Sequence, residues 1–192
     1  MASGVTRYLI YTVRRRGLEP VGAADVARAL RAELGGAPVS VRVASGHVEV
    51  SASGVDLESL VRAAEKVVGP VIEVESPPGR GVLADYAWLM DKERFWEAHE
   101  LLEEAWKSSG RDPAIQALIL AAAVMAKAQE GRLSGIERNI KVLNDVQRES
   151  GLDVVDVDCL RSEALKALRG ERPSPLACIR VSGVERGGPR AE

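Results

Sequence analysis

The chain is poor in the side chains that build metal centres and disulfide scaffolds. Its 192 residues include only two cysteines and two histidines. The cysteines, Cys159 and Cys178, fit neither a disulfide framework nor a four-ligand zinc site, and we interpret Cys159 as a small core residue. We therefore predict no cofactor, and only a metal held by histidine and carboxylate side chains stays open.

Long apolar runs and an excess of basic charge are also lacking. No apolar run reaches the roughly 18 residues of a membrane span. Residues Met1–Gly4 do not begin a charged region followed by an apolar stretch, so we expect no secretory signal. Lysine and arginine number 26 against 28 acidic residues, which disfavours nucleic acid as the partner. We expect a cytoplasmic protein without membrane contact.

The common catalytic signatures are absent as well. The sequence has no G-x-S-x-G, no H-E-x-x-H and no C-x-x-C motif. Apolar residues make up 46% and charged residues 28% of the chain, which is the balance of an ordinary globular protein. Function must therefore be argued from periodicity and from the one distinctive motif of the chain.

Residues 1–76 combine the period-two alternation of strands with the periodicity of helices. Valines alternate with polar residues in the second strand, so one of its faces is expected to be buried. The predicted order is strand, helix, strand, strand, helix, strand, at residues 7–13, 25–34, 39–44, 47–53, 56–68 and 71–75. This β-α-β-β-α-β order predicts a ferredoxin-like module, an antiparallel sheet with both helices on one face.

A proline- and glycine-rich linker at 77–81 separates this module from a region of helical periodicity alone. The predicted fold class is thus α+β, a ferredoxin-like module followed by an all-α helical-hairpin bundle at 82–170. The 113–130 helix is apolar nearly all round and should be the most buried. Residues 171–192 are predicted as a largely disordered tail. The helices of the bundle are predicted at 82–90, 95–107, 113–130, 134–148 and 158–168.

The highest concentration of polar and aromatic side chains lies on one predicted helix, over Arg94–Trp106 (RFWEAHELLEEAW). This run resembles the F-x-EAHE-x-LE-x-x-W signature of DUF309, a helical family without an assigned activity. Residues 116–121 resemble the Q-G-L-I-Q-L-A helix of that family, and residues 130–135 resemble its G-N-x-x-G-A turn. The resemblance spans about residues 83–170 and implies a helical fold there. Three departures from the family pattern argue against a polar pocket on the 113–130 helix: Ala117, Leu120 and Ile136.

His99 and Glu103 are the candidates for chemistry, because residues four apart share a helix face. They could serve as metal ligands or as an acid–base pair in which the carboxylate raises the pKa of the imidazole. Glu137 could add a carboxylate to this site, as could Asp153, Asp156 or Asp158. This hypothesis makes the protein a metal-dependent enzyme, for instance a hydrolase. Its weakness is the ligand count, because a catalytic zinc needs about three protein ligands.

The competing interpretation makes the same motif a network of buried, satisfied polar groups. We expect His99 to form hydrogen bonds with Glu103 and with Gln116 on the next helix. Glu97, Glu100 and Glu104 are expected on the opposite, more solvent-exposed face of the helix. In a third interpretation, Trp96, Trp88 or Tyr86 contacts a peptide in a groove. The expected network consists of Phe95, Glu97, His99, Glu100, Glu103, Trp106 and Gln116.

Three functional hypotheses follow. The leading one is a non-enzymatic interaction or scaffold protein whose helical hairpins contact a protein partner or a second copy of the chain. The alternative is the metal-dependent enzyme centred on His99 and Glu103. The third is an RNA-binding adaptor that uses Arg14, Arg15 and Arg16. Against it, residues 47–53 supply no aromatic side chain on which a base could stack.

Overall fold

The computed structural model describes residues 7–180, which divide into two units. The first unit holds the described residues up to Glu75, with 129–131 and 167–172. The second unit holds 76–128, 132–166 and 173–180 of the described residues. Within the described chain, no helix is both long enough and apolar enough to cross a membrane.

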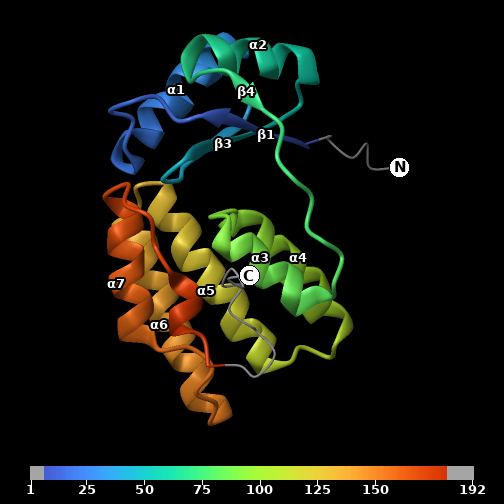
Figure 1. Cartoon of the computed structure of the whole chain (residues 1–192), viewed down its shortest axis with the longest axis vertical. Coiled ribbons are helices and arrows are strands. Elements are labelled where there is room, and N and C mark those ends of the chain that lie inside the picture. The colour runs from blue at the N-terminus through green and yellow to red at the C-terminus, as the bar shows by residue number, and fades with distance from the viewer. Residues whose placement is uncertain (1–6, 181–192) are drawn as a thin grey trace, which may run out of the picture. The chain divides into compact units, whose positions relative to one another are not determined.

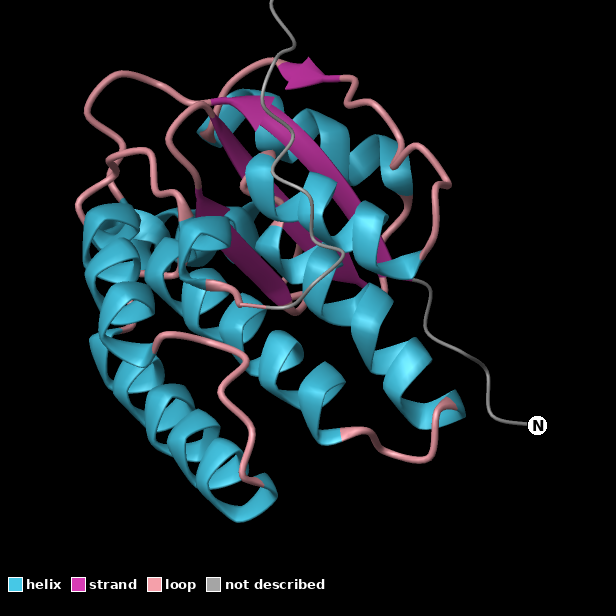
Figure 2. Cartoon of the chain, turned by 60° about the horizontal axis from the view of Figure 1, so that its bottom comes forward, coloured by secondary structure: helices cyan, strands magenta, loops and turns pink. Residues whose placement is uncertain are grey.

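A four-stranded sheet in the order β2-β3-β1-β4 organises the first unit (Figures 1 and 2). Every strand pairing is antiparallel, which confirms the predicted β-α-β-β-α-β module. The last strand pairs only with β1 and is shorter than predicted. The elements are β1 (Arg7–Val13), η1 (Pro20–Gly22), α1 (Ala23–Glu33), β2 (Val39–Val43), β3 (His47–Ser53), α2 (Leu57–Val67) and β4 (Val71–Ile72).

The apolar core of the first unit lies between the sheet and its two helices. Leu30 of α1 and Leu60 of α2 are fully buried in one cluster with the inward valines of β2 and β3. The β2–β3 hairpin is closed by the Ala44 amide, which donates to the carbonyl of His47 at 2.9 Å. Asp56 caps α2, because its carboxylate accepts from the Ser59 amide at 2.8 Å. Alternation and capping thus position both helices on the same face of the sheet.

The other face of the sheet is polar, yet it is buried as well. Glu49 is 0% exposed and Arg42 is 2% exposed, although alternation predicts only one buried face for these strands. The two residues lie opposite each other in the β2–β3 register, with Arg42 Nη1 3.6 Å from Glu49 Oε2. Arg42 Nε also lies 3.3 Å from Glu130 Oε1 of the same unit. Charges buried this deeply require such partners.

The second unit is a bundle of helices (Figures 1 and 2). The middle of α5 is almost entirely buried, as its apolar composition predicts. Tyr86 joins α3 to α5 by donating its hydroxyl to the Leu118 carbonyl at 3.0 Å, and burial raises the pKa of this phenol. The elements are α3 (Val82–Asp91), α4 (Phe95–Ser108), α5 (Pro113–Gln129), α6 (Leu133–Ser150), α7 (Val157–Leu168) and η2 (Pro175–Cys178).

The structure departs from the sequence prediction at the C-terminal end. Cys159 and Cys178 form a disulfide, because the chain turns back beside α7 after residue 170. Residues 171–180 therefore carry η2 and a bridge between Val155 and Ile179, instead of a disordered tail. Residues 181–192 of the predicted tail lie outside the described residues.

Candidate functional site

The motif helix α4 begins at a sharp turn after α3. Glu93 adopts the left-handed conformation, with φ of 57°, and is only 6% exposed. The Arg94 amide then donates to the Leu89 carbonyl at 2.9 Å, which closes the end of α3. The Arg94 carbonyl in turn accepts from the Ala98 amide at 3.0 Å and starts α4. This turn fixes where the motif side chains emerge.

Arg94 and Glu97 form the closest ion pair of the motif. Arg94 Nε and Nη2 each donate to a different carboxylate oxygen of Glu97 at 2.6 Å. The Arg94 side chain is 7% exposed and the Glu97 side chain is 23% exposed. Two-point pairing of this kind fixes both side chains, because the planar guanidinium matches the carboxylate. Glu97 is therefore partly buried and paired, instead of pointing freely into water as the helical spacing suggests.

The same guanidinium lies over the indole of Trp88 on α3. The Arg94 Cζ atom is 5.3 Å from the ring centroid, and Lys92 Nζ is 5.7 Å from it. Both distances are within the range of cation–π attraction. Trp88 is only partly buried and Lys92 is exposed, so an indole with one exposed cation is presented where α3 meets α4, while the buried Arg94 supports the ring.

Burial sets the protonation of Glu97. Loss of solvent, assisted by the neighbouring charge of Glu100, raises the pKa of Glu97 from the ordinary 4.5 to about 7. Between about pH 4.5 and 7 this carboxyl therefore carries a proton more often in the folded protein than in the unfolded chain, and in its ionised form it pairs with Arg94. By linkage, the stabilising contribution of this proton is complete below the unfolded pKa and is lost as the pH rises through the folded pKa.

We expect Glu97→Gln to remove this pH dependence. Relative to Glu97→Gln, the wild-type protein should lose about 1–3 kcal/mol of unfolding free energy between pH 4.5 and 7.5. Thermal unfolding of both proteins across that range, followed by circular dichroism, measures the difference. If the Arg94 pair controlled the titration, the wild type would instead lose stability as the pH fell below 4.5, and the sign of the difference would reverse.

His99 stacks on Trp96 of the same helix. The two rings are 5.1 Å apart between centroids and nearly parallel, with an interplanar angle of 9°. Glu103, one turn further, is 41% exposed and binds Lys107 Nζ at 2.9 Å. This hydrogen bond lowers the pKa of Glu103, while the charge of His99 contributes least among its causes. Each of the two candidate residues thus has a further contact within α4.

The remaining candidate ligands are engaged elsewhere. Glu137 on α6 pairs with Arg161 on α7, with Nε and Oε1 3.3 Å apart. Asp156 accepts from Arg180 Nη2 at 2.7 Å and caps α7 by accepting from the Cys159 amide at 3.0 Å. Among residues 7–180, no three histidine, cysteine or acidic side chains are grouped so that they could hold a metal ion.

The α3–α4 turn, the motif helix and the buried α5 all fall within a segment that matches a known family. Residues 83–139 match DUF309, a domain of unknown function. The chain contains a DUF309 domain. The match begins in α3 and ends within α6, so the N-terminal sheet unit lies outside it. No curated protein and no solved structure matches the chain significantly.

The apolar residues of the DUF309 motif anchor its helix. Phe95 and Leu102 are 0% exposed and face the interior of the bundle. Trp106 is partly buried, and the guanidinium of Arg111 lies 5.6 Å from its ring centroid. Gln116 is partly buried on α5, and the hydrogen bond between His99 and Gln116 stays a prediction. Phe95 therefore fixes the helix, while the indoles and the Arg94–Glu97 pair lie nearer its surface.

The arginines after β1 lie outside the DUF309 domain and have structural contacts. Arg14 donates to the carbonyls of Leu18, Ala44 and Ser45 and pairs with Glu19. Arg15 reaches the Glu65 carbonyl at 3.4 Å, and Arg16 is exposed. The Arg14 side chain, 14% exposed, is thus committed to holding loops of the first unit. Only Arg15 and Arg16 of the candidate RNA-binding residues are presented to solvent.

Two features of the DUF309 domain escape the sequence interpretation. Arg94 stands three residues before Glu97, and this i,i+3 spacing of opposite charges would have identified the pair. The Trp88 surface depends on the angle between α3 and α4, which local periodicity does not predict. The Arg94–Glu97 pair was therefore detectable from the sequence, whereas the Trp88 surface could be found only from the fold.

Proposed function

We propose that this DUF309 protein is a non-enzymatic interaction protein that binds a protein partner at its α3–α4 corner. The corner is defined here by Trp88, Lys92, Arg94 and Trp96. The observation that carries the proposal is the partly exposed indole of Trp88, held beneath Arg94 at 5.3 Å and Lys92 at 5.7 Å. Tryptophan is among the residues most enriched at the positions that dominate binding energy at protein interfaces.

The rigidity of the corner supports the same conclusion. Arg94 is held by two bonds of 2.6 Å to Glu97, and Trp96 by stacking on His99. A side chain that is already ordered loses little conformational entropy when a partner binds. The polar groups of the motif thus hold the indoles of Trp88 and Trp96 in place, the first through Arg94 and the second through His99. This role for the E-A-H-E residues requires no catalysis.

The proposal places the protein in the cytoplasm, where a second copy of the chain or another protein would be its partner. The near balance of 26 basic and 28 acidic residues gives no general attraction to a nucleic acid. In such a compartment a disulfide is usually transient and redox-sensing.

Site-specific photocrosslinking tests the proposal in the cell that produces the protein. A photoreactive phenylalanine derivative replaces exposed Asp91 at the end of α3, next to the intact corner. Two control chains are matched to it. One carries the same crosslinker together with Trp88→Ala, and the other carries it at exposed Arg138 on α6.

We expect one adduct of defined mass at position 91, reduced about tenfold or more by Trp88→Ala, as for an interface residue that dominates binding. Position 138 should give no such adduct. A mass of twice the chain would identify a second copy as the partner. The proposal is wrong if position 91 gives no adduct, or if its adduct persists in a Trp88→Ala protein with an unchanged melting temperature.

A further inference from the structure

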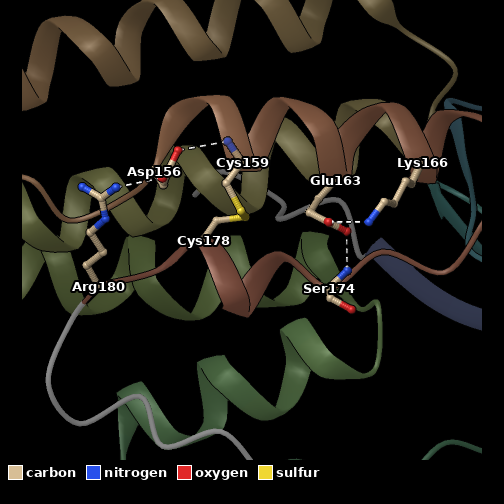
Figure 3. The surroundings of a disulfide bond; sticks show 7 residues. All are labelled: Asp156, Cys159, Glu163, Lys166, Ser174, Cys178 and Arg180. Atoms are coloured by element: carbon tan, nitrogen blue, oxygen red, sulfur yellow. Dashed lines mark hydrogen bonds and ion pairs between the residues drawn. A yellow bond between two sulfur atoms is a disulfide. The ribbon is translucent and has the colours of Figure 1, made fainter.

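The segment Pro173–Arg180, called here the C-terminal strap, runs alongside α7 and packs against α3 (Figure 3). Pro173, Pro175 and Cys178 of the strap are buried, whereas the residues between them are more exposed. The strap therefore covers part of both helices. We propose that the Cys159–Cys178 disulfide is a redox-controlled latch, and that its reduction releases the strap and uncovers the surface of α3 and α7 beneath.

The strap is attached at three places of different strength. At its start, the Ser174 amide donates to Glu163 Oε2 at 2.7 Å, and Glu163 also binds Lys166 Nζ at 2.6 Å. At its end, Arg180 Nη2 pairs with Asp156 at 2.7 Å, and Arg180 Nη1 pairs with Asp153. Between these two points, the disulfide joins Cys178 to Cys159 of α7 (Figure 3). Only this third attachment is covalent.

The polar attachments at the Arg180 end of the strap are weak for a segment of this length. The Arg180 side chain is 48% exposed and Asp156 39%, and ion pairs this exposed contribute little because water screens them. The backbone contacts at this end are the Arg180 amide to the Val154 carbonyl at 2.8 Å and the Asp156 amide to the Cys178 carbonyl at 2.8 Å. Against them stands the conformational entropy that every strap residue regains on release. The disulfide reduces this gain in conformational entropy, because it ties Cys178 to Cys159, 19 residues earlier in the chain, and so keeps the strap close to α7.

The two ends of the disulfide differ in access. Cys178 is 1% exposed, whereas Cys159 is only partly buried on α7. A dithiol reductant would therefore attack the Cys159 sulfur with one thiolate, which breaks the disulfide and releases Cys178 as a thiolate that takes up a proton. The second thiol of the reductant then attacks the mixed disulfide and releases Cys159. The protein gains two electrons and two protons, and the reductant leaves as its own disulfide.

The full chain is well suited to a test because these are its only two cysteines. Any effect of a thiol reductant on the folded protein therefore acts through this bond. The probe is amide hydrogen exchange, read by mass spectrometry, of the oxidised protein and of the protein reduced with dithiothreitol. Alkylation of free thiols confirms the state of each sample. The informative amides are those of Ser174, Ala177, Ile179 and Arg180 in the strap, together with the Asp156 amide beside it.

We expect these amides to exchange at least about tenfold faster after reduction, while α4 and α5 keep their protection, as in a local opening. Cys159→Ser/Cys178→Ser should reproduce the reduced pattern and should not respond to dithiothreitol. Arg180→Ala, in the oxidised state, should keep the strap protected. Unchanged strap protection after reduction would overturn the proposal. So would equal loss of protection in α4 and α5, because the bond would then stabilise the whole bundle.

Discussion

Arg42→Met is expected to lower the free energy of unfolding by about 3–5 kcal/mol. Arg42 is 2% exposed and Glu49 is 0% exposed, and they face each other across β2 and β3. Removing the guanidinium leaves the Glu49 carboxylate buried without the positive charge opposite it. The cost of that buried charge, and not the 3.6 Å contact itself, sets the size of the effect. Thermal unfolding followed by circular dichroism measures it.

The matched control is the double variant Arg42→Met/Glu49→Leu, which replaces both charges by apolar groups. Buried ion pairs are often no better than apolar residues of similar size, so most of the lost stability should return. A complete double-mutant cycle also requires the single variant Glu49→Leu, in which Arg42 keeps its contact to Glu130 at 3.3 Å. If the single and double variants lost the same stability, the face of the sheet would depend on size and packing rather than charge.

Phe95→Ala is expected to cost about 3–5 kcal/mol, because it empties a large volume in a closely packed core. Phe95 is 0% exposed at the first position of α4. The loss would act on the whole DUF309 motif, since this ring anchors the helix that carries Trp96 and His99. All three tryptophans of the chain lie on α3 and α4. Guanidinium unfolding followed by tryptophan fluorescence therefore reports on this region.

Glu104→Ala on the same helix is the control, because Glu104 is exposed. It should shift the transition midpoint little, whereas Phe95→Ala should lower the midpoint without changing the slope. A loss below about 1 kcal/mol for Phe95→Ala would mean that the bundle collapses into the space. The motif helix would then not depend on this anchor.

Much of the fold is predictable, because the residues buried in a strand or helix recur in the sequence with the period of that element. The β-α-β-β-α-β order follows from alternation and from helical spacing, and the apolar α5 is the central helix for the same reason. The burial of Glu49 on the second face of the sheet is not predictable in this way. Alternation shows that a face is polar, but it does not show whether that polar face meets water.

The contacts within the candidate site follow less directly from the sequence than the fold does. Helical spacing puts His99 and Glu103 on one face, but a side chain with several neighbours pairs with the one whose geometry fits best. His99 stacks on Trp96 and Glu103 binds Lys107, both within the same helix. The Cys159–Cys178 bond depends on the path of the chain after α7, and no local pattern reports that path.

In the function we propose, the E-A-H-E residues shape an interaction surface and do not hold a catalytic metal. The most direct test is the metal content of the purified, tag-free protein, measured beside that of His99→Ala, together with the melting temperature of each. We predict no stoichiometric metal in either protein. The variant should melt lower, by roughly 2–4 °C for each kcal/mol lost with the Trp96 stack. Near-stoichiometric metal that disappears in His99→Ala would contradict the account and make Glu103 and Glu137 the next residues to replace.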